Sequence, residues 1–235
     1  MSGWTAKRFW KTATAEAVEG GFTVRLDGRA VKTPAKAPLI LPTLAMAQAV
    51  AAEWDAQEGA IRPETMPVAR AAHSAIDKIG PQRADVQALI VAYGGSDLLC
   101  YRAEAPEALS AREAAAWDPL IDWAAAEFGA PLVVTKGVQP VAQPAASLAR
   151  LEARVDALSD FELAAFHDLV AISGSLIVGL AVLHGRLDAE AAWTKSRIDE
   201  DWQVELWGQD EEAAETTARR RLAFLEAHRF WALCR

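Results

Sequence analysis

Cysteine is scarce in this chain, which has only Cys100 and Cys234 among its 235 residues. The two lie in unlike sequence contexts, and no CxxC motif occurs. A disulfide framework and a structural zinc site are therefore disfavoured, and a reducing compartment fits the composition.

Long apolar runs are also missing. The most apolar segment, Leu169–Leu183, has 15 residues, whereas a bilayer span needs about 20. Residues 1–11 contain no apolar core of a secretory signal. We expect a cytoplasmic protein that does not insert into a membrane.

The motifs of the common catalytic and cofactor sites are absent. Neither GxxxxGK[ST] nor GxGxxG occurs, and no Gly-x-Ser-x-Gly, HxxxH or HExxH spacing is found. Gly174 and Gly179 are expected to permit close helix packing, and His167-Asp168 to form a buried hydrogen-bonded pair. We predict no catalytic residue, no cofactor and no metal. The net charge of −8 disfavours nucleic-acid binding as well.

The first part of the chain has the pattern of β structure followed by a helix. Asp27-Gly28 lies between alternating residues, which predicts a hairpin between strands over 22–26 and 30–33. Thr43 is a predicted N-cap, and the helix that follows it is expected to end at Gly59.

The rest of the chain is mainly helical in pattern. Helices are predicted over 105–128 with an interruption or kink at Pro119, and over 147–158, 161–184 and 210–231. The sequence thus predicts an α+β fold. We expect an N-terminal α+β domain over residues 1–90 and an all-α helical domain over 91–235.

Residues 187–207 predict a single helix with two apolar faces, because apolar side chains recur on opposite sides of a helical wheel. One face holds Leu187, Ala191, Ile198, Trp202 and Leu206. The other holds Trp193, Glu200, Val204 and Trp207.

Three interpretations of this helix stay open. It could lie at the centre of a bundle, with Glu200 paired to an arginine. Its tryptophan-rich face could dock another protein, since tryptophans ringed by charge are typical interface anchors. Glu200 or Asp201 could also serve a carboxylate-dependent hydrolase.

Several segments together resemble a known family, the ATP synthase F1 assembly chaperones that hold the free alpha subunit. The resemblance covers almost the whole chain, and the order and spacing of the segments make it specific. They are RFWK (8–11), VRLDGRAVKTP (24–34), LPT (41–43), AAEWDAQEGAIRPETMP (51–67), SAID (74–77), SDLLCYR (96–102), WDP (117–119), QP (143–144) and SRIDEDWQVELWG (196–208).

The resemblance implies an N-terminal α+β domain, a helical C-terminal domain, and a chaperone without enzymatic activity or cofactor. It also implies the F1 alpha subunit as partner. We expect the chain to be a monomer. A self-associating scaffold is a further alternative.

The resemblance also implies a functionally important acid near the Trp-Gly motif. Glu200 and Glu211 are both candidates. Relatives from eukaryotes carry an aromatic residue after the second acid, where this chain has Glu212, so Glu200 keeps the pattern better. The residues expected to contact the partner are Glu200, Glu211, Trp207, Trp193, Arg197 and Gly208.

Overall fold

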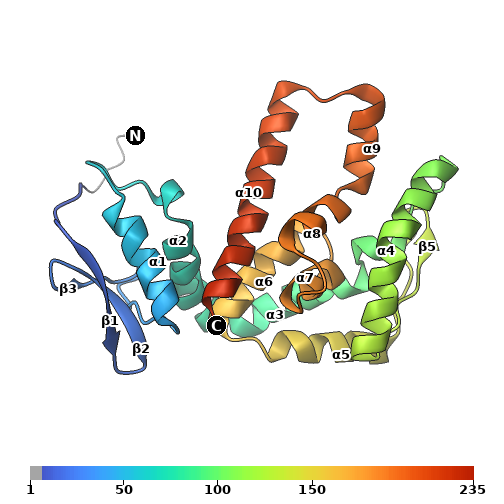
Figure 1. Cartoon of the computed structure of the whole chain (residues 1–235). Helices are drawn as coiled ribbons and strands as arrows, with labels where there is room; N and C mark the ends of the chain where they lie inside the picture. The colour runs from blue at the N-terminus through green and yellow to red at the C-terminus, as the bar shows by residue number, and fades with distance from the viewer. Residues whose placement is uncertain (1–6) are drawn as a thin grey trace. The chain divides into compact units, whose positions relative to one another are not determined.

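The computed structural model describes residues 7–235 and confirms the predicted α+β class. A three-stranded antiparallel sheet lies near the N-terminus, and helices follow it (Figure 1). The chain divides into two compact units. The first runs up to Arg83 and adds Ser159–Ala165 and Arg229–Arg235, and the second holds Ala84–Leu158 and Phe166–His228.

The sheet of the first unit has the order β1-β2-β3, formed by Ala13–Val18, Gly21–Leu26 and Arg29–Ala30. As predicted, Asp27 and Gly28 form the turn between β2 and β3. Both have positive φ, 48° and 82°, which is the conformation that two-residue hairpin turns require. The Asp27 carboxylate also accepts hydrogen bonds from the backbone N–H groups of Lys11 and Thr12.

Helix α1, Leu44–Asp55, packs on β1 and β2. Thr43 caps it as predicted, with its hydroxyl oxygen accepting from the Met46 N–H at 3.1 Å. The helix ends at Asp55, earlier than the predicted Gly59. The rest of the first unit follows as short helices: η1 Pro63–Thr65, α2 Pro67–Ser74, the π-helix η2 Ala75–Ile79 and η3 Gly80–Gln82.

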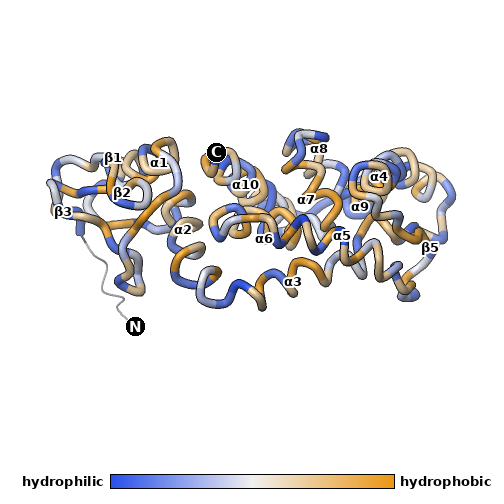
Figure 2. The backbone as a smooth tube through the Cα atoms, turned by 90° about the horizontal axis from the view of Figure 1, so that it is seen from below, coloured by the Kyte–Doolittle hydropathy of each residue, from blue (hydrophilic) through white to orange (hydrophobic). Residues whose placement is uncertain are grey.

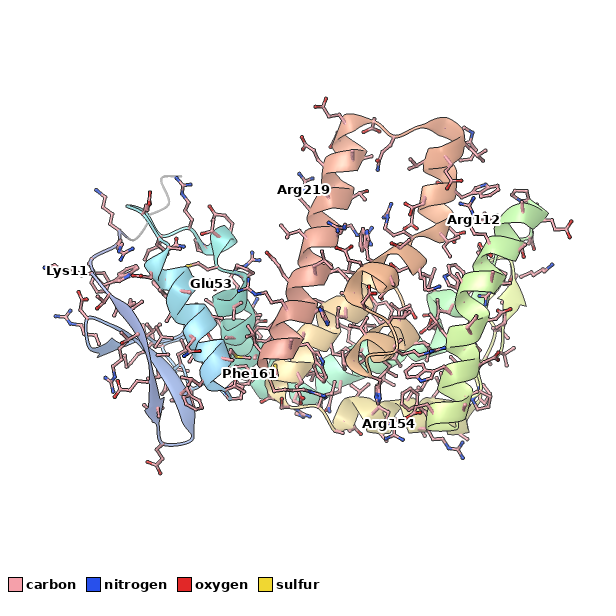
Figure 3. All side chains as sticks on the ribbon, in the orientation of Figure 1. Lys11, Glu53, Arg112, Arg154, Phe161 and Arg219 are labelled. Atoms are coloured by element: carbon pink, nitrogen blue, oxygen red, sulfur yellow. The ribbon has the colours of Figure 1, made fainter. Side chains whose placement is uncertain are left out.

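Glu53 ties the end of α1 to the start of α2. Its two carboxylate oxygens accept from the N–H groups of Val68 and Ala69, each at 2.8 Å (Figure 3). These N–H groups lie in the first turn of α2 and have no partner within the helix, so the carboxylate satisfies them and fixes the two helices to each other.

The remaining elements are mostly helices, with one short parallel pair of strands, β4 and β5. In chain order they are α3 Arg83–Gly95, η4 Leu98–Cys100, β4 Tyr101–Arg102, α4 Glu107–Phe128, β5 Thr135–Lys136, α5 Ala145–Asp156, α6 Asp160–Ser173, α7 Leu176–Leu183, α8 Ala189–Lys195, α9 Ile198–Trp207 and α10 Glu211–Leu233. Helix α4 runs through Pro119 without the predicted interruption.

The predicted helix over 161–184 is two helices, so this prediction was wrong. Helix α6 ends before Gly174, whose φ is 74°, and Ser175 then caps α7. All eight residues of α7 are buried, and the segment appears as a nearly continuous hydrophobic stretch in Figure 2. Gly174 therefore makes a turn. Only Gly179 has the predicted packing role, because an added Cβ would lie 2.8 Å from Phe166 and from Val170.

A buried aspartate explains the break between α6 and α7. The Asp97 carboxylate accepts from the Ser175 hydroxyl at 2.7 Å and from the Ile177 N–H at 3.0 Å. The Leu98 N–H donates to the Gly174 carbonyl. Burial raises the pKa of Asp97 to about 6, although these hydrogen bonds oppose that shift. The contacts fasten the segment after α3 to the first turn of α7.

The predicted helix over 187–207 is also two helices, α8 and α9, separated at Ser196 and Arg197. The Ser196 hydroxyl donates back to the Trp193 carbonyl at 2.8 Å, and Arg197 leaves the helical conformation with φ −120° and ψ 17°. The break lets the two helices take different directions, so their tryptophans do not share one face.

Two further predictions concern single residues. His167 Nδ1 lies 2.9 Å from Asp168 Oδ1, but Asp168 is exposed, so the predicted pair forms at the surface and not in the core. Cys100 and Cys234 are both free thiols, and burial raises the pKa of each to about 12. None of the helices between residues 7 and 235 combines the length and the apolar content that crossing a membrane requires.

Candidate functional site

A groove of about 590 Å³ lies between α9 and the N-terminal half of α10, within the second unit. In Figure 1 these two helices run antiparallel and are joined by a short loop. Helix α9 lines the groove with Glu200, Gln203, Val204 and Trp207, and Arg197 lies at its start. The loop and α10 line it with Gly208, Asp210, Glu212, Thr216 and Arg220.

Trp207 is the main apolar feature of this groove. It lies in the last turn of α9 and is 77% exposed, and its neighbour Leu206 is 57% exposed. A single exposed leucine is ordinary, but an exposed indole next to a second exposed apolar side chain is a frequent mark of an interaction surface.

Gly208 ends α9 and turns the chain toward α10. Its φ of 78° and ψ of 174° lie in a region that is essentially restricted to glycine. Its N–H donates to the Val204 carbonyl at 2.8 Å. Gly208 therefore acts through the backbone, by placing Trp207 at the mouth of the groove.

Arg197 and Glu200 form the charged end of the groove. The Arg197 guanidinium is buried and stacks over the Trp193 ring, 5.1 Å from its centroid. Its Nε lies 3.4 Å from Asp201 Oδ1, and its Nη1 lies 3.9 Å from Glu200 Oε1. The last distance is too long for a direct hydrogen bond, so the exposed Glu200 carboxylate keeps the capacity to accept from a partner.

Trp193 is placed differently from Trp207. It lies on α8, is only 6% exposed, and packs against Phe224 of α10 with ring centroids 6.1 Å apart. The structure therefore brings Arg197, Glu200, Trp207 and Gly208 together at the groove and places Trp193 in the core beside it.

Glu211 is exposed in the first turn of α10 but does not line the groove, whereas its neighbour Glu212 does. Asp210 caps this helix, since its Oδ1 accepts from the Ala213 N–H at 2.8 Å. Of the two candidate acids, Glu200 is the one that faces the groove.

The opposite side of α9 packs on α4. Arg112 of α4 points toward α9 (Figure 3) and donates to both carboxylate oxygens of Glu205, at 2.8 and 3.0 Å. Its guanidinium also lies 4.7 Å from the centroid of the Trp202 ring. Since this side is held by α4, the side that carries Glu200 and Trp207 is left for the groove.

Of α10, only Glu211 was predicted to contact the partner, and the residues of this helix that line the groove were not predicted. Glu212, Thr216 and Arg220 recur at a spacing of four, which places them on one face of a helix, and this spacing was a usable signal. Arg220 is held by a hydrogen bond to the Ile172 carbonyl at 2.9 Å.

A buried acid beneath α9 was also not predicted. Glu113 of α4 is fully buried and accepts from the Ala103 N–H at 2.8 Å. Burial, together with the neighbouring Asp199 of α9, raises the pKa of Glu113 to about 7. Its position midway between Leu109 and Trp117 on one helical stripe could have predicted this burial.

Metal binding finds no support in the geometry of residues 7–235, where no three His, Cys, Asp or Glu side chains are grouped as a metal site requires. The groove instead combines the exposed Trp207 indole, the exposed Glu200 carboxylate and two arginines, Arg197 and Arg220, that already have partners within the chain. Such a surface is suited to binding a polypeptide.

Comparison with known proteins identifies the family. Residues 7–125 match the family model described as ATP12 chaperone protein. The chain is similar to Atp12 from Paracoccus denitrificans, with 52% sequence identity, a TM-score of 0.95 and coverage of 98% of this chain and 99% of that chain. It is similar to Atu1473, described as a chaperone from Agrobacterium tumefaciens, with 41% identity, a TM-score of 0.93 and coverage of 97% and 86%.

A mitochondrial protein is a more distant relative. Protein atp12 of Schizosaccharomyces pombe is 26% identical over an alignment of 223 residues, and the match covers 89% of this chain and 76% of that protein. The chain belongs to the ATP12 chaperone family, and its function is that of a chaperone for assembly of the F1 sector of ATP synthase rather than that of an enzyme.

Proposed function

We propose that this chaperone holds the unassembled alpha subunit of F1 and that the groove between α9 and α10 is a docking site for it. The observation that carries the proposal is the exposed Trp207 beside the Glu200 carboxylate at one groove. An indole supplies a large apolar contact, and an acid at the rim supplies charge complementarity and faster encounter.

The role of such a contact follows from mass action. A free alpha subunit exposes the surface that the beta subunit later covers, and exposed apolar patches and strand edges promote self-association. A chaperone that covers this surface with lower affinity than beta keeps alpha soluble and then gives it up to beta. We propose that the chain does this as a monomer, without a cofactor, in the cytoplasm, where its two free thiols would stay reduced.

Charge reversal at Glu200 tests the groove. Glu200→Lys should weaken alpha binding about tenfold and leave the free energy of unfolding nearly unchanged, because the side chain is exposed and has only a long contact with Arg197. Affinity for purified alpha subunit would be measured by biolayer interferometry. Glu152→Lys, at an exposed position of α5, is the matched control.

Three further variants extend the test. Trp207→Ala should lower alpha binding at least as much as Glu200→Lys, whereas Leu89→Ala, at another exposed apolar residue, should not. Glu211→Lys should have the smaller effect of the two acids, since Glu211 lies outside the groove. Unchanged alpha binding in Glu200→Lys and Trp207→Ala would contradict the groove as the contact. A preference for beta over alpha in a pull-down would contradict the partner.

A further inference from the structure

A second cavity, of about 510 Å³, lies within the first unit and plays no part in the groove described above. Its lining is largely apolar and comes from the segment after β3, the end of α1, η1 and α2. The apolar lining residues are Pro34, Trp54, Ile61, Pro63, Met66 and Ala69. A cavity of this size and character is typical of a site that takes a small apolar ligand or a few side chains.

Two polar ring atoms at this cavity lack a partner. Trp54 Nε1 and His73 Nε2 are buried, and neither has a hydrogen-bond partner among residues 7–235. Burial lowers the pKa of His73, against the influence of Asp77, so its imidazole is neutral at neutral pH. Buried polar groups in folded proteins nearly always have partners. Neither atom is exposed to solvent, so the surface that a ligand meets in this cavity is largely apolar.

The rim of the cavity is positively charged although the chain as a whole is acidic. Lys32, Arg70 and Lys78 line it and are exposed, and no ion pair with a described carboxylate engages them. The one acid at the rim, Asp77, accepts from the Thr33 hydroxyl at 2.6 Å and from the Ala35 N–H at 3.0 Å. The rim is therefore complementary to an anion, in a protein with a net charge of −8.

The lining also gathers segments that were singled out in the sequence and that the groove leaves unexplained. Thr33 and Pro34 belong to VRLDGRAVKTP, Trp54 and Met66 to AAEWDAQEGAIRPETMP, and Asp77 to SAID. Segments that lie far apart along the chain thus converge on one cavity, which is the arrangement expected of a binding site.

We propose that this cavity binds an extended peptide segment in which apolar side chains are followed by an aspartate or glutamate. The apolar side chains fill the space lined by Trp54, Met66 and Ala69, and the acid lies against Arg70 and Lys78. The cavity would thereby make a second contact with the alpha subunit, and in this respect the inference rests on the proposed function.

The test uses the full-length protein and a pair of short fluorescein-labelled peptides. One carries Leu and Phe followed by two aspartates, and the other is identical except that lysines replace the aspartates. Fluorescence anisotropy should give an affinity about tenfold higher for the acidic peptide. The Trp54 indole N–H signal in a ¹H–¹⁵N NMR spectrum, assigned with Trp54→Phe, should shift as that peptide is added.

Matched charge reversals locate the contact. Arg70→Glu should weaken binding of the acidic peptide about fivefold or more, whereas Arg29→Glu, an exposed arginine on β3 outside the cavity, should leave it unchanged. Both side chains are exposed, so circular dichroism should show both variants folded. Equal binding of the two peptides, equal effects of the two variants, or binding of oleate but of neither peptide would overturn the proposal.

The proposal for the cavity and the proposal for the groove can be contradicted independently of each other. Peptide binding that is lost in Arg70→Glu and kept in Glu200→Lys supports the cavity, even if alpha proves not to dock at the groove. Alpha binding that is lost in Glu200→Lys, with peptide binding unchanged in Arg70→Glu, overturns the cavity and leaves the proposed function standing.

Discussion

Arg112 of α4 donates two parallel hydrogen bonds to Glu205 of α9, with Nη1 to Oε1 at 2.8 Å and Nη2 to Oε2 at 3.0 Å. The pairing raises the pKa of Arg112 and lowers that of Glu205. Both side chains are largely exposed, so the pair contributes little to stability. Its two-point geometry does fix how α9 is rotated on α4, and that rotation directs Glu200 and Trp207 into the groove.

Removal of Arg112 should therefore affect binding more than stability. We expect Arg112→Ala to leave the free energy of unfolding nearly unchanged, because both side chains of the pair are exposed, and to weaken alpha binding severalfold. Urea denaturation and biolayer interferometry would measure the two effects. Glu205→Ala should behave alike, and the double variant should cost less than the sum of the single ones. Strictly additive losses would show that the pair does not act as a unit.

Gly208 should be the least replaceable residue of the loop. Because its backbone conformation suits only glycine, Gly208→Ala should cost about 1–3 kcal/mol, although an added Cβ would meet no atom within 4 Å. Gly95→Ala is the control, since Gly95 ends α3, has no positive φ and is equally uncrowded. Thermal denaturation of both variants measures the difference. Similar melting temperatures would contradict a backbone origin.

Gly179 is restricted by packing and not by its backbone. Gly179→Ala would place a Cβ 2.8 Å from the Phe166 ring and from a Val170 methyl group, and overpacking of this kind costs about 1–3 kcal/mol. Val170→Ala makes room, so the double variant should be more stable than the sum of the two single effects predicts. Urea denaturation of all three variants tests this, and simple additivity would argue against the clash.

Glu113 should make stability depend on pH. Its pKa is raised to about 7 in the folded protein and is near 4.3 when unfolded, so the folded state binds this proton more tightly. Its stabilising contribution is present in full below the unfolded pKa and is lost as the pH rises through about 7. Arg102, which lies nearby, opposes the shift but does not reverse it.

The variant that checks this is Glu113→Gln. Its amide can still accept from the Ala103 N–H and can donate to Asp199 without carrying a charge. We expect it to be more stable than the wild type above pH 7, by about 1 kcal/mol or 2–4 °C in Tm. Between about pH 5 and 7.5 its stability should change less. Part of the dependence should remain, because the pKa of Asp97 is also raised, to about 6. An unchanged pH profile would be inconsistent with a protonated Glu113.

The sequence predicted those elements whose causes are local. The hairpin follows from Asp27-Gly28 and the start of α1 from Thr43, because each residue acts on neighbours within a few positions. The breaks at Gly174 and Ser196 were missed. The first depends on Asp97, which is 78 residues away in the chain from Ser175, and no periodicity reveals such a contact.

The site was predictable in composition but not in arrangement. On one continuous helix Trp193 and Trp207 would share a face, and only the turn at Ser196 and Arg197 separates the buried ring from the exposed one. The family, by contrast, was correctly predicted from the order and spacing of short segments, which no single helix break disturbs.

The loop after Trp207 leads into four acids, Asp210, Glu211, Glu212 and Glu215, all exposed. When two copies approach with their Trp207 indoles facing each other, the acids of the two copies repel each other. This repulsion disfavours self-association through the exposed indole. Salt shortens the range of that repulsion to about 10 Å at 0.1 M. Self-association of the free chaperone should therefore rise with ionic strength, whereas low salt should favour the monomer, whose Trp207 is free to contact the alpha subunit.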